Sequence, residues 1–297
     1  MKILILGANG QLGLSLTERI QFHQEARHEF FTLGKSEVDI TDLEALKRVV
    51  NTIRPNVVVN AAAWTNVRSA EENYGKAFNI NVRGVSNLAE ATISLGARII
   101  QVSTDYVFSG DGCTPISESE NTNPMNNYGR SKAEAEKYLL SNHSDRTIIV
   151  RTAWLYGPYG SNFLKTILQK AILNPTEKIQ VVSDQWGQPT SSLDLAETIL
   201  NLAFSKTQSG VFHGTNGGET NWFHFARIGF EHAGVNPDRV TPIKSSELDS
   251  TVKRPSYSVL GHDSWEHAGL KAMRHWEEPV KEIAIRIRED LEVSHGI

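Results

Sequence analysis

Two side chains spaced four residues apart, Tyr128 and Lys132, could together move a proton. On a helix such a pair lies on one face, about one turn apart. A tyrosine hydroxyl is a poor acid at neutral pH, because its ordinary pKa is about 10. A neighbouring ammonium favours the phenolate, so the tyrosine can then exchange a proton with a carbonyl or an alcohol. Thr104, at the predicted end of a strand, could orient the same oxygen. We therefore predict Tyr128, Lys132 and Thr104 as catalytic residues.

A glycine-rich segment, residues 7–13 with the sequence GANGQLG, stands between the first predicted strand and the first predicted helix. Glycines at these spacings permit a tight turn and the close approach of a pyrophosphate, and the helix N-terminus offers free N–H groups. The spacing is G-x-x-G-x-x-G, which by itself also fits a plain strand–helix turn. Its place inside an alternating strand–helix pattern favours a dinucleotide, and the predicted cofactor contacts are Gly7, Asn9, Gly10, Gln11, Leu12 and Gly13.

The residues after the second and third predicted strands would surround the rest of such a cofactor. The second strand is expected to end near residues 33–36, where a carboxylate would hold a ribose 2′-hydroxyl and a cation would accept a 2′-phosphate. Lys35 and Ser36 favour NADPH, whereas Glu37 or Asp39 would favour NADH if the strand ran two residues further. A solvated loop and plain tight packing are the alternatives. The predicted contacts are Lys35, Ser36, Asp39, Ile40, Ala61, Ala62 and Ala63, together with Tyr128 and Lys132.

Hydrophobic patterning predicts the elements that position these side chains. Apolar runs without polar alternation indicate buried strands at residues 3–6, 30–33, 56–60, 98–102 and 147–150. Helical patterns lie between them at residues 12–22, 42–54, 74–95 and 131–140, the second opened by a predicted capping box of Thr41 and Glu44. This alternation predicts an α/β fold, a doubly wound parallel sheet of the Rossmann type.

The pattern changes after about residue 152. Helices are predicted at 162–173, 193–205, 222–233 and 277–291, with strands at 179–183 and 211–213. We predict an NAD(P)-binding domain over residues 1–152, to which elements near 193–215 return. Residues 153–297 are predicted to form mostly a smaller α/β substrate-binding subdomain.

Composition excludes several classes of protein. The 297 residues carry 30 Lys and Arg against 34 Asp and Glu, a net charge of −4, which offers no basic surplus for nucleic acid or an anionic membrane. No apolar run reaches the length of about 18 residues needed to span a bilayer. A single cysteine, Cys113, excludes an internal disulfide framework and has no adjacent basic partner. The single cysteine and the lack of a membrane-spanning run or signal peptide lead us to expect a cytoplasmic protein. The ten histidines show no ligand spacing, so we expect no metal site.

With these motifs the chain resembles the extended short-chain dehydrogenase/reductase superfamily and, more closely, the dTDP-4-dehydrorhamnose reductase family. The glycine-rich segment and the Y-x-x-x-K pair carry the superfamily resemblance. More specific strings carry the closer one: NAAAWT at 60–65, STDYVF at 103–108, RTAWLYG at 151–157, DQWGQPT at 184–190 and RP at 254–255. The resemblance covers nearly the whole chain, in family order.

The resemblance implies reduction of the 4-keto group of a dTDP-6-deoxy-hexulose to give dTDP-L-rhamnose, with NADPH as the expected cofactor and NADH as the alternative. It implies that Tyr128 donates the proton, with Lys132 as its partner and Thr104 tuning the pair. Some members are metal-bridged dimers through a glutamate early in the first helix. Ser15 stands there in this chain, so we expect no metal and a monomer or weak homodimer. The implied substrate contacts are Thr65, Thr104, Asp105, Trp154 and Arg254, the last at the diphosphate.

Two other interpretations stay open at this point. Another nucleotide-sugar 4-ketoreductase, or an epimerase of the extended type, would share these motifs. An epimerase would retain its NAD whereas a reductase would consume NADPH, so cofactor turnover separates the two. A non-catalytic regulatory subunit resembling the β subunit of methionine adenosyltransferase is the alternative from another class. The presence of Thr104, Tyr128 and Lys132 favours retained chemistry.

Overall fold

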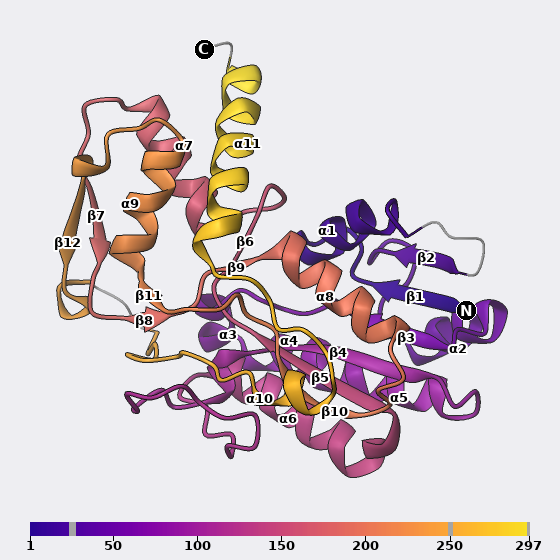
Figure 1. Ribbon diagram of the computed structural model, residues 1–297. Coiled ribbons are helices and arrows are strands. Elements are labelled where there is room, and N and C mark those ends of the chain that lie inside the picture. Colours follow the sequence, from indigo (N-terminus) through magenta and orange to yellow (C-terminus); the bar gives the residue numbers. More distant parts are fainter. Residues whose placement is uncertain (24–27, 249–251, 296–297) are drawn as a thin grey trace.

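Six parallel strands form the central sheet, in the order β10-β5-β4-β3-β1-β2 (Figure 1). The computed structural model describes residues 1–23, 28–248 and 252–295. The direction of strand order reverses between β1 and β3, and ligands of such sheets bind at the carboxyl ends of the strands beside this point. The predicted doubly wound sheet is therefore confirmed. Its strands are β1 (Lys2–Leu6), β2 (Glu29–Leu33), β3 (Val57–Asn60), β4 (Arg98–Thr104), β5 (Thr147–Thr152) and β10 (Gly210–His213).

Alternate residues of the strands face two different helical layers. In β1, Ile3 and Ile5 belong to the core under helices α1 and α8, whereas Leu4 and Leu6 belong to the core under α2, α5 and α6. All four side chains are fully buried, which explains why this strand shows no polar alternation. The covering helices are α1 (Gln11–Ile20) and α8 (Ser192–Phe204) on one face, and α2 (Leu43–Ile53), α5 (Gly84–Ile93) and α6 (Asn127–Asn142) on the other.

Two local predictions were wrong. The cap of α2 is Asp42, whose side chain accepts from the Ala45 N–H at 2.9 Å. Thr41 lies one residue before this cap, and its hydroxyl donates to Asp39 at 2.7 Å. The helix predicted over residues 74–95 is interrupted by a π-helical turn, Asn79–Arg83, between α4 (Tyr74–Phe78) and α5. A short helix that was not predicted, α3 (Val67–Glu72), precedes α4.

A second core lies beside the sheet, in the upper part of Figure 1. It contains Leu164, Phe225, Phe230 and Ile283 from three helices. These are α7 (Phe163–Leu173), α9 (Trp222–His232) and α11 (Glu277–His295), which pack with the parallel pair β7 (Ile179–Val182) and β12 (Val240–Ile243). The remaining elements are β6 (Leu155–Tyr156), β8 (Trp186–Gly187), β9 (Thr190–Ser191), β11 (Thr220–Asn221), α10 (Asp263–His267) and the single turns Asp105–Val107, Ser144–Arg146, Pro237–Arg239 and Ser245–Glu247.

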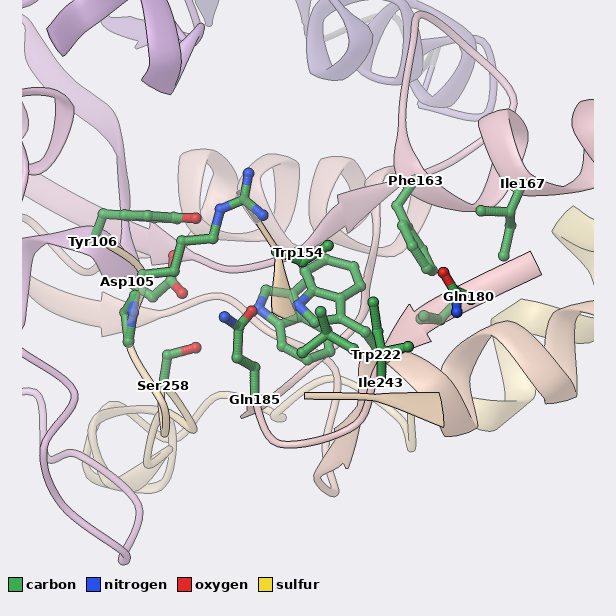
Figure 2. A pocket seen from close by; sticks show the side chains of 15 residues that line it. Asp105, Tyr106, Trp154, Phe163, Ile167, Gln180, Gln185, Trp222, Ile243 and Ser258 are labelled. Atoms are coloured by element: carbon green, nitrogen blue, oxygen red, sulfur yellow. The ribbon is translucent and has the colours of Figure 1, made fainter. Parts of the chain in front are cut away.

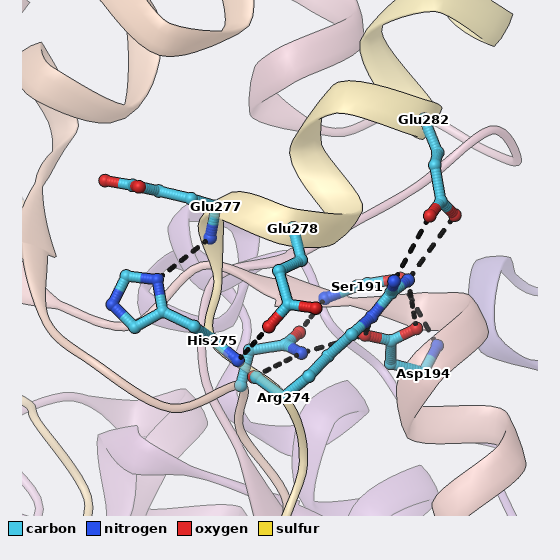
Figure 3. Close-up of polar contacts among 8 residues, drawn as sticks. Ser191, Asp194, Arg274, His275, Glu277, Glu278 and Glu282 are labelled. Carbon is cyan, nitrogen blue, oxygen red and sulfur yellow. Dashed lines mark hydrogen bonds and ion pairs between the residues drawn. The ribbon is translucent and has the colours of Figure 1, made fainter.

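Arg274 joins the two parts of the molecule (Figure 3). Its guanidinium donates to both carboxylate oxygens of Asp194 in α8, at 2.8 and 3.0 Å, and to Glu282 in α11 at 3.2 Å. Asp194 also accepts from Asn216, which in turn holds the Ser191 N–H at 2.8 Å. This network fixes the start of α8 against α11. In the part of the chain that the structure describes, no helix combines the length and apolar character that crossing a membrane requires.

Candidate active site

Three adjoining cavities follow the carboxyl ends of the strands. The first, here called the loop cavity, has about 210 Å³ and lies at the glycine-rich segment. The central cavity, about 370 Å³, shares Gly10, Ala61 and Ala63 with it. The outer cavity, about 410 Å³, shares Asp105, Tyr106 and Trp154 with the central one. The loop cavity is lined by Gly7, Asn9, Gly10, Lys35, Val38, Asp39, Ile40, Ala61, Ala62, Ala63 and Ile80.

The glycine-rich segment turns directly from β1 into α1. Gly7 has φ +83°, and a Cβ added there would lie 2.6 Å from the backbone nitrogen of Ala62, so only glycine permits this close approach. A Cβ at Gly13 would lie 2.2 Å from the Gly7 carbonyl oxygen, which assigns Gly13 to helix–strand packing. Gly10 precedes α1 without a capping side chain, so the first N–H groups of the helix are available to an anion. Gln11 and Leu12 line the central cavity.

The loop after β2 presents one cation and one carboxylate to the loop cavity. β2 ends at Leu33, within the predicted span. Lys35, whose side chain is 79% exposed, lies 3.6 Å from Asp39. Ser36 is not among the described residues that line the cavity, and its hydroxyl donates to Glu37 at 3.0 Å. Glu37 does not line the cavity either, and its carboxylate also accepts from the Gly34 N–H at 2.9 Å.

Tyr128, Lys132 and Thr104 meet in the central cavity. Tyr128 and Lys132 stand on the first two turns of α6, and Tyr128 lines the cavity together with Thr104 at the end of β4. The Lys132 ammonium donates to the Val102 carbonyl at 2.7 Å. A Cβ at Gly129 would lie 2.0 Å from the Tyr106 carbonyl oxygen, so this glycine lets α6 approach the end of β4.

Burial shifts both titratable groups of this pair. It raises the pKa of Tyr128 above its ordinary value, and the neighbouring Thr104 side chain offsets the rise only in part. Burial also lowers the pKa of Lys132 to about 8, although the negative charge of Glu136 opposes the change. At neutral pH the Tyr128 phenol is thus protonated, and Lys132, one turn further along the same helix, is mostly charged. This arrangement suits a proton donor whose conjugate base is stabilised by the neighbouring charge.

A buried ion pair that sequence reasoning missed lies behind Lys132. Glu136, one turn further along α6, is 2.7 Å from the Arg151 guanidinium of β5, and both side chains are almost completely buried. The Ser103 hydroxyl also donates to Glu136. Spacing offered a signal here, because residues 128, 132 and 136 repeat every four positions along one helix face.

Asp105 stands where the central and outer cavities meet. Its side chain is 2% exposed, and Oδ1 accepts from the Thr104 hydroxyl at 3.0 Å. Among the described residues Oδ2 has no hydrogen-bond partner. Burial raises the pKa of Asp105 to about 6, and the hydroxyls of Ser258 and Thr104 offset that rise only partly. Thr65, the remaining predicted contact of this region, lines the central cavity.

The outer cavity combines an aromatic and aliphatic wall with a cation. Trp154 lies on Trp222 with their ring centroids 3.6 Å apart (Figure 2), and Trp154 has φ +45°, a left-handed conformation that costs a non-glycine residue about 1–3 kcal/mol. The positive charge of Arg254 opposes the rise that burial causes in the pKa of Tyr106. Sequence reasoning identified Trp154 and Arg254 but missed Tyr106 and Trp222. The other lining residues are Phe163, Ile167, Gln180, Val181, Val182, Gln185, Ile243, Leu248, Pro255 and Ser258.

Asn81 holds the segment after β3 against α6 and was also missed. It lies in the π-helical turn, is buried, and exchanges two hydrogen bonds with the backbone of Trp64, at 2.8 and 3.1 Å. Its amide also donates to Ser131 at 2.9 Å. Such turns are frequent at functional sites.

Ser15 occupies a buried contact between two helices. Its hydroxyl donates to Ser192 of α8 at 2.8 Å. The described residues hold no group of three or more His, Cys, Asp or Glu that could bind a metal ion.

Comparison with known proteins relates this chain to reductases of nucleotide sugars. The family described as the RmlD substrate binding domain matches residues 1–288. A dTDP-4-keto-6-deoxy-D-glucose reductase of Streptomyces niveus is 41% identical over 92% of this chain and 93% of the relative. A dTDP-4-dehydrorhamnose reductase of Streptomyces griseus is 40% identical over 94% of this chain and 91% of the relative.

A solved structure agrees closely with this fold. The dTDP-4-dehydrorhamnose reductase of Bacillus anthracis, in complex with NADP, superposes with a TM-score of 0.89 at 36% identity, covering 96% of this chain and 98% of the other. The predicted resemblance is confirmed, and the chain belongs to the RmlD substrate binding domain family together with the dTDP-4-dehydrorhamnose reductases.

Proposed function

We propose that this protein is an NADPH-dependent reductase that converts dTDP-4-dehydro-L-rhamnose to dTDP-L-rhamnose. The observation that carries the proposal is the position of Tyr128. Its phenol lies in the central cavity, which adjoins the loop cavity on one side and the outer cavity on the other. A cofactor entering along the glycine-rich segment and a sugar nucleotide entering through the outer cavity would therefore meet at one protonated hydroxyl. The names of the relatives support this choice of substrate.

The loop cavity fits a dinucleotide. Gly7 leaves space against Ala62 that a side chain would fill, and the N-terminus of α1 offers free N–H groups for a pyrophosphate. We propose that Lys35 faces the 2′-phosphate of NADPH, while Asp39 and Ile40 border the adenosine. NADH is the alternative, because the Asp39 carboxylate lines the same cavity. NADPH, when bound, supplies the hydride that reduces the substrate carbonyl.

In the proposed mechanism the chain's own residues supply the proton and the orientation. Thr104 and Tyr128 hydrogen-bond the carbonyl oxygen, and Tyr128 gives that oxygen its phenolic proton as negative charge develops. Lys132 stabilises the phenolate that remains. Thr65, Asp105 and Trp154 contact the sugar.

The diphosphate would lie at Arg254, whose planar guanidinium suits anionic oxygens. The proposal thus assigns the cofactor to residues 1–152, with 193–215 returning to that domain, and the sugar nucleotide mostly to 153–297. The protein is proposed to act in the cytoplasm as a monomer or weak homodimer.

A coupled assay tests the proposal. dTDP-glucose is converted by a dehydratase and an epimerase in the presence of this protein, NADPH absorbance is followed, and the sugar product is identified. Consumption of NADPH with formation of dTDP-L-rhamnose is the expected result. The 41% identity to a dTDP-4-keto-6-deoxy-D-glucose reductase favours a second candidate, reduction without epimerisation. Omitting the epimerase separates the two. No NADPH consumption in either case would refute both and favour a regulatory subunit.

A further inference from the structure

We infer that Trp222 is a positioning residue that holds the Trp154 indole as the wall between the central and outer cavities, and so determines how tightly the sugar nucleotide is held. This inference rests on the proposed function. Trp154 lines both cavities, whereas Trp222 lines only the outer one. Neither residue lines the loop cavity, where the adenosine of the cofactor is proposed to lie.

The two indoles form a parallel stack. Their centroids are 3.6 Å apart and their planes differ by 11°, so the Trp154 ring lies flat against the Trp222 ring. The segment at Gly187 also fits this ring closely. A Cβ at Gly187 would lie 2.6 Å from the Trp154 indole, so glycine at this position leaves the space that the ring occupies. The indole of Trp154 is thus confined by Trp222 and by the backbone of Gly187.

The stack separates two ends of the outer cavity that differ in chemistry. In Figure 2 the two indoles lie at the middle, with Asp105, Tyr106 and Ser258 on one side and Phe163, Ile167 and Gln180 on the other. A sugar nucleotide has a similar division. Its sugar and diphosphate are polar and suit the end with Asp105 and Ser258, whereas the flat faces of its base suit the end with Phe163 and Ile167. The Trp154 wall therefore stands where a pyranose must pass from the outer cavity towards Tyr128.

Trp154 needs an external support to keep this orientation. Its φ of +45° belongs to the left-handed region, which a tryptophan adopts only when its surroundings impose it. Trp222 is well placed to do so, because it is anchored in the second core. It is the first residue of α9, which is capped by Asn221, and its ring contacts Phe163 at 4.6 Å between centroids.

Steady-state kinetics on Trp222→Leu test the inference. The variant loses the stack, and stacked aromatic pairs are worth roughly two- to tenfold in an equilibrium constant. We expect KM for the sugar nucleotide to rise by about that factor, with KM for NADPH unchanged. Trp222→Phe keeps a ring against Trp154 and should restore KM to within about twofold. Phe223→Leu, on the next residue of the same helix, removes an aromatic ring that lines none of the three described cavities and is the matched control.

A double-mutant cycle identifies the route of the effect. If Trp222 acts through Trp154, adding Trp222→Leu to Trp154→Leu changes KM no further, whereas independent contacts with the substrate would give multiplied effects. Multiplied effects, an unchanged KM in Trp222→Leu, or an equal rise in KM for NADPH would each overturn the inference. If Trp222→Leu does not fold, Trp222→Met carries the same test.

Failure of this inference and failure of the proposed function give different experimental results. Calorimetric titration of the wild-type protein with dTDP, alongside the turnover assay, tests the proposed function alone. A wild type that neither binds dTDP nor consumes NADPH refutes the proposed function. A wild type that does both, with an unaffected Trp222→Leu variant, refutes only the role of Trp222.

Discussion

Replacing Asp105 by asparagine should change how the stability of the protein depends on pH. The carboxylate is buried, accepts from Thr104, and leaves Oδ2 without a partner in the described part of the chain. Asparagine keeps the shape and an acceptor oxygen for the Thr104 hydroxyl while removing the charge. Only the wild type therefore has a titrating carboxyl at this position, and burial raises the pKa of that carboxyl.

The magnitude follows from the two protonation states. The pKa of Asp105 is about 6 in the folded protein against an ordinary value of 3.8. Between these values the folded state binds a proton that the unfolded state has lost, so the free energy of unfolding falls as pH rises through this range. A tenfold change in an acid constant is ~1.36 kcal/mol, which gives a total loss of about 3 kcal/mol. About 2 kcal/mol of it falls between roughly pH 4.5 and 7.5. The asparagine side chain of the variant does not titrate, so the variant loses none of this free energy.

Urea unfolding followed by circular dichroism at a series of pH values measures this difference. The free energy of unfolding of Asp105→Asn minus that of the wild type should rise by about 2 kcal/mol from pH 4.5 to 7.5. The unpaired amide hydrogens of asparagine cost about 1–3 kcal/mol at every pH, so they displace the curve without altering this rise. Asp111→Asn, at an exposed carboxylate, is the control. Parallel curves for Asp105→Asn and the wild type would refute the reasoning.

Four further predictions concern the reaction. Tyr128→Phe removes the proton donor and should lower kcat by about 10²–10⁴-fold without unfolding the protein, as judged by circular dichroism; a near-normal kcat would contradict the role. Wild-type kcat/KM should fall above about pH 8, because Lys132, whose burial lowers its pKa to about 8, then loses the charge that stabilises the phenolate; equal rates at pH 7 and pH 9 would exclude this. Lys35→Ala should raise KM for NADPH roughly tenfold to a hundredfold and spare NADH, with Ser36→Ala as the control; equal effects on both cofactors would make Lys35 a plain surface residue. Chelation with EDTA should leave activity unchanged, and activity lost in EDTA and restored by Mg²⁺ would show a metal requirement.

Local patterns predicted the sheet well because its inner strands are buried on both faces. Ile3, Leu4, Ile5 and Leu6 form a continuous apolar run, and each is fully buried. The residues at which the strands end were harder to predict. β4 extends to Thr104, two residues beyond its apolar run, because Ser103 and Thr104 pair with Arg151 and Thr152 of β5. Cross-strand pairing of this kind has no signature in the local sequence.

The parts of the site that sequence reasoning missed depend on contacts between distant segments. Trp222 meets Trp154 only because the second core brings α9 against the end of β5, and nothing around residue 222 indicates this. The π-helical turn at Asn81 interrupts a helix whose residues otherwise suit an α-helix. The capping box failed for a local reason, since the next residue, Asp42, accepts from the Ala45 N–H and caps the helix instead of Thr41.

The order of the sheet has a consequence for the chain as it is synthesised. β10 pairs with β5, yet 57 residues, from 153 to 209, separate them in the sequence. Until residues 210–213 leave the ribosome, β5 is an open edge whose six residues are all destined for burial. Open edges of this kind template pairing with other chains. A chain halted between residues 152 and 210 would contain Thr104, Tyr128 and Lys132 and still lack its sixth strand. Such a fragment is expected to aggregate or be degraded, so truncation should reveal itself first as loss of protein rather than as loss of turnover.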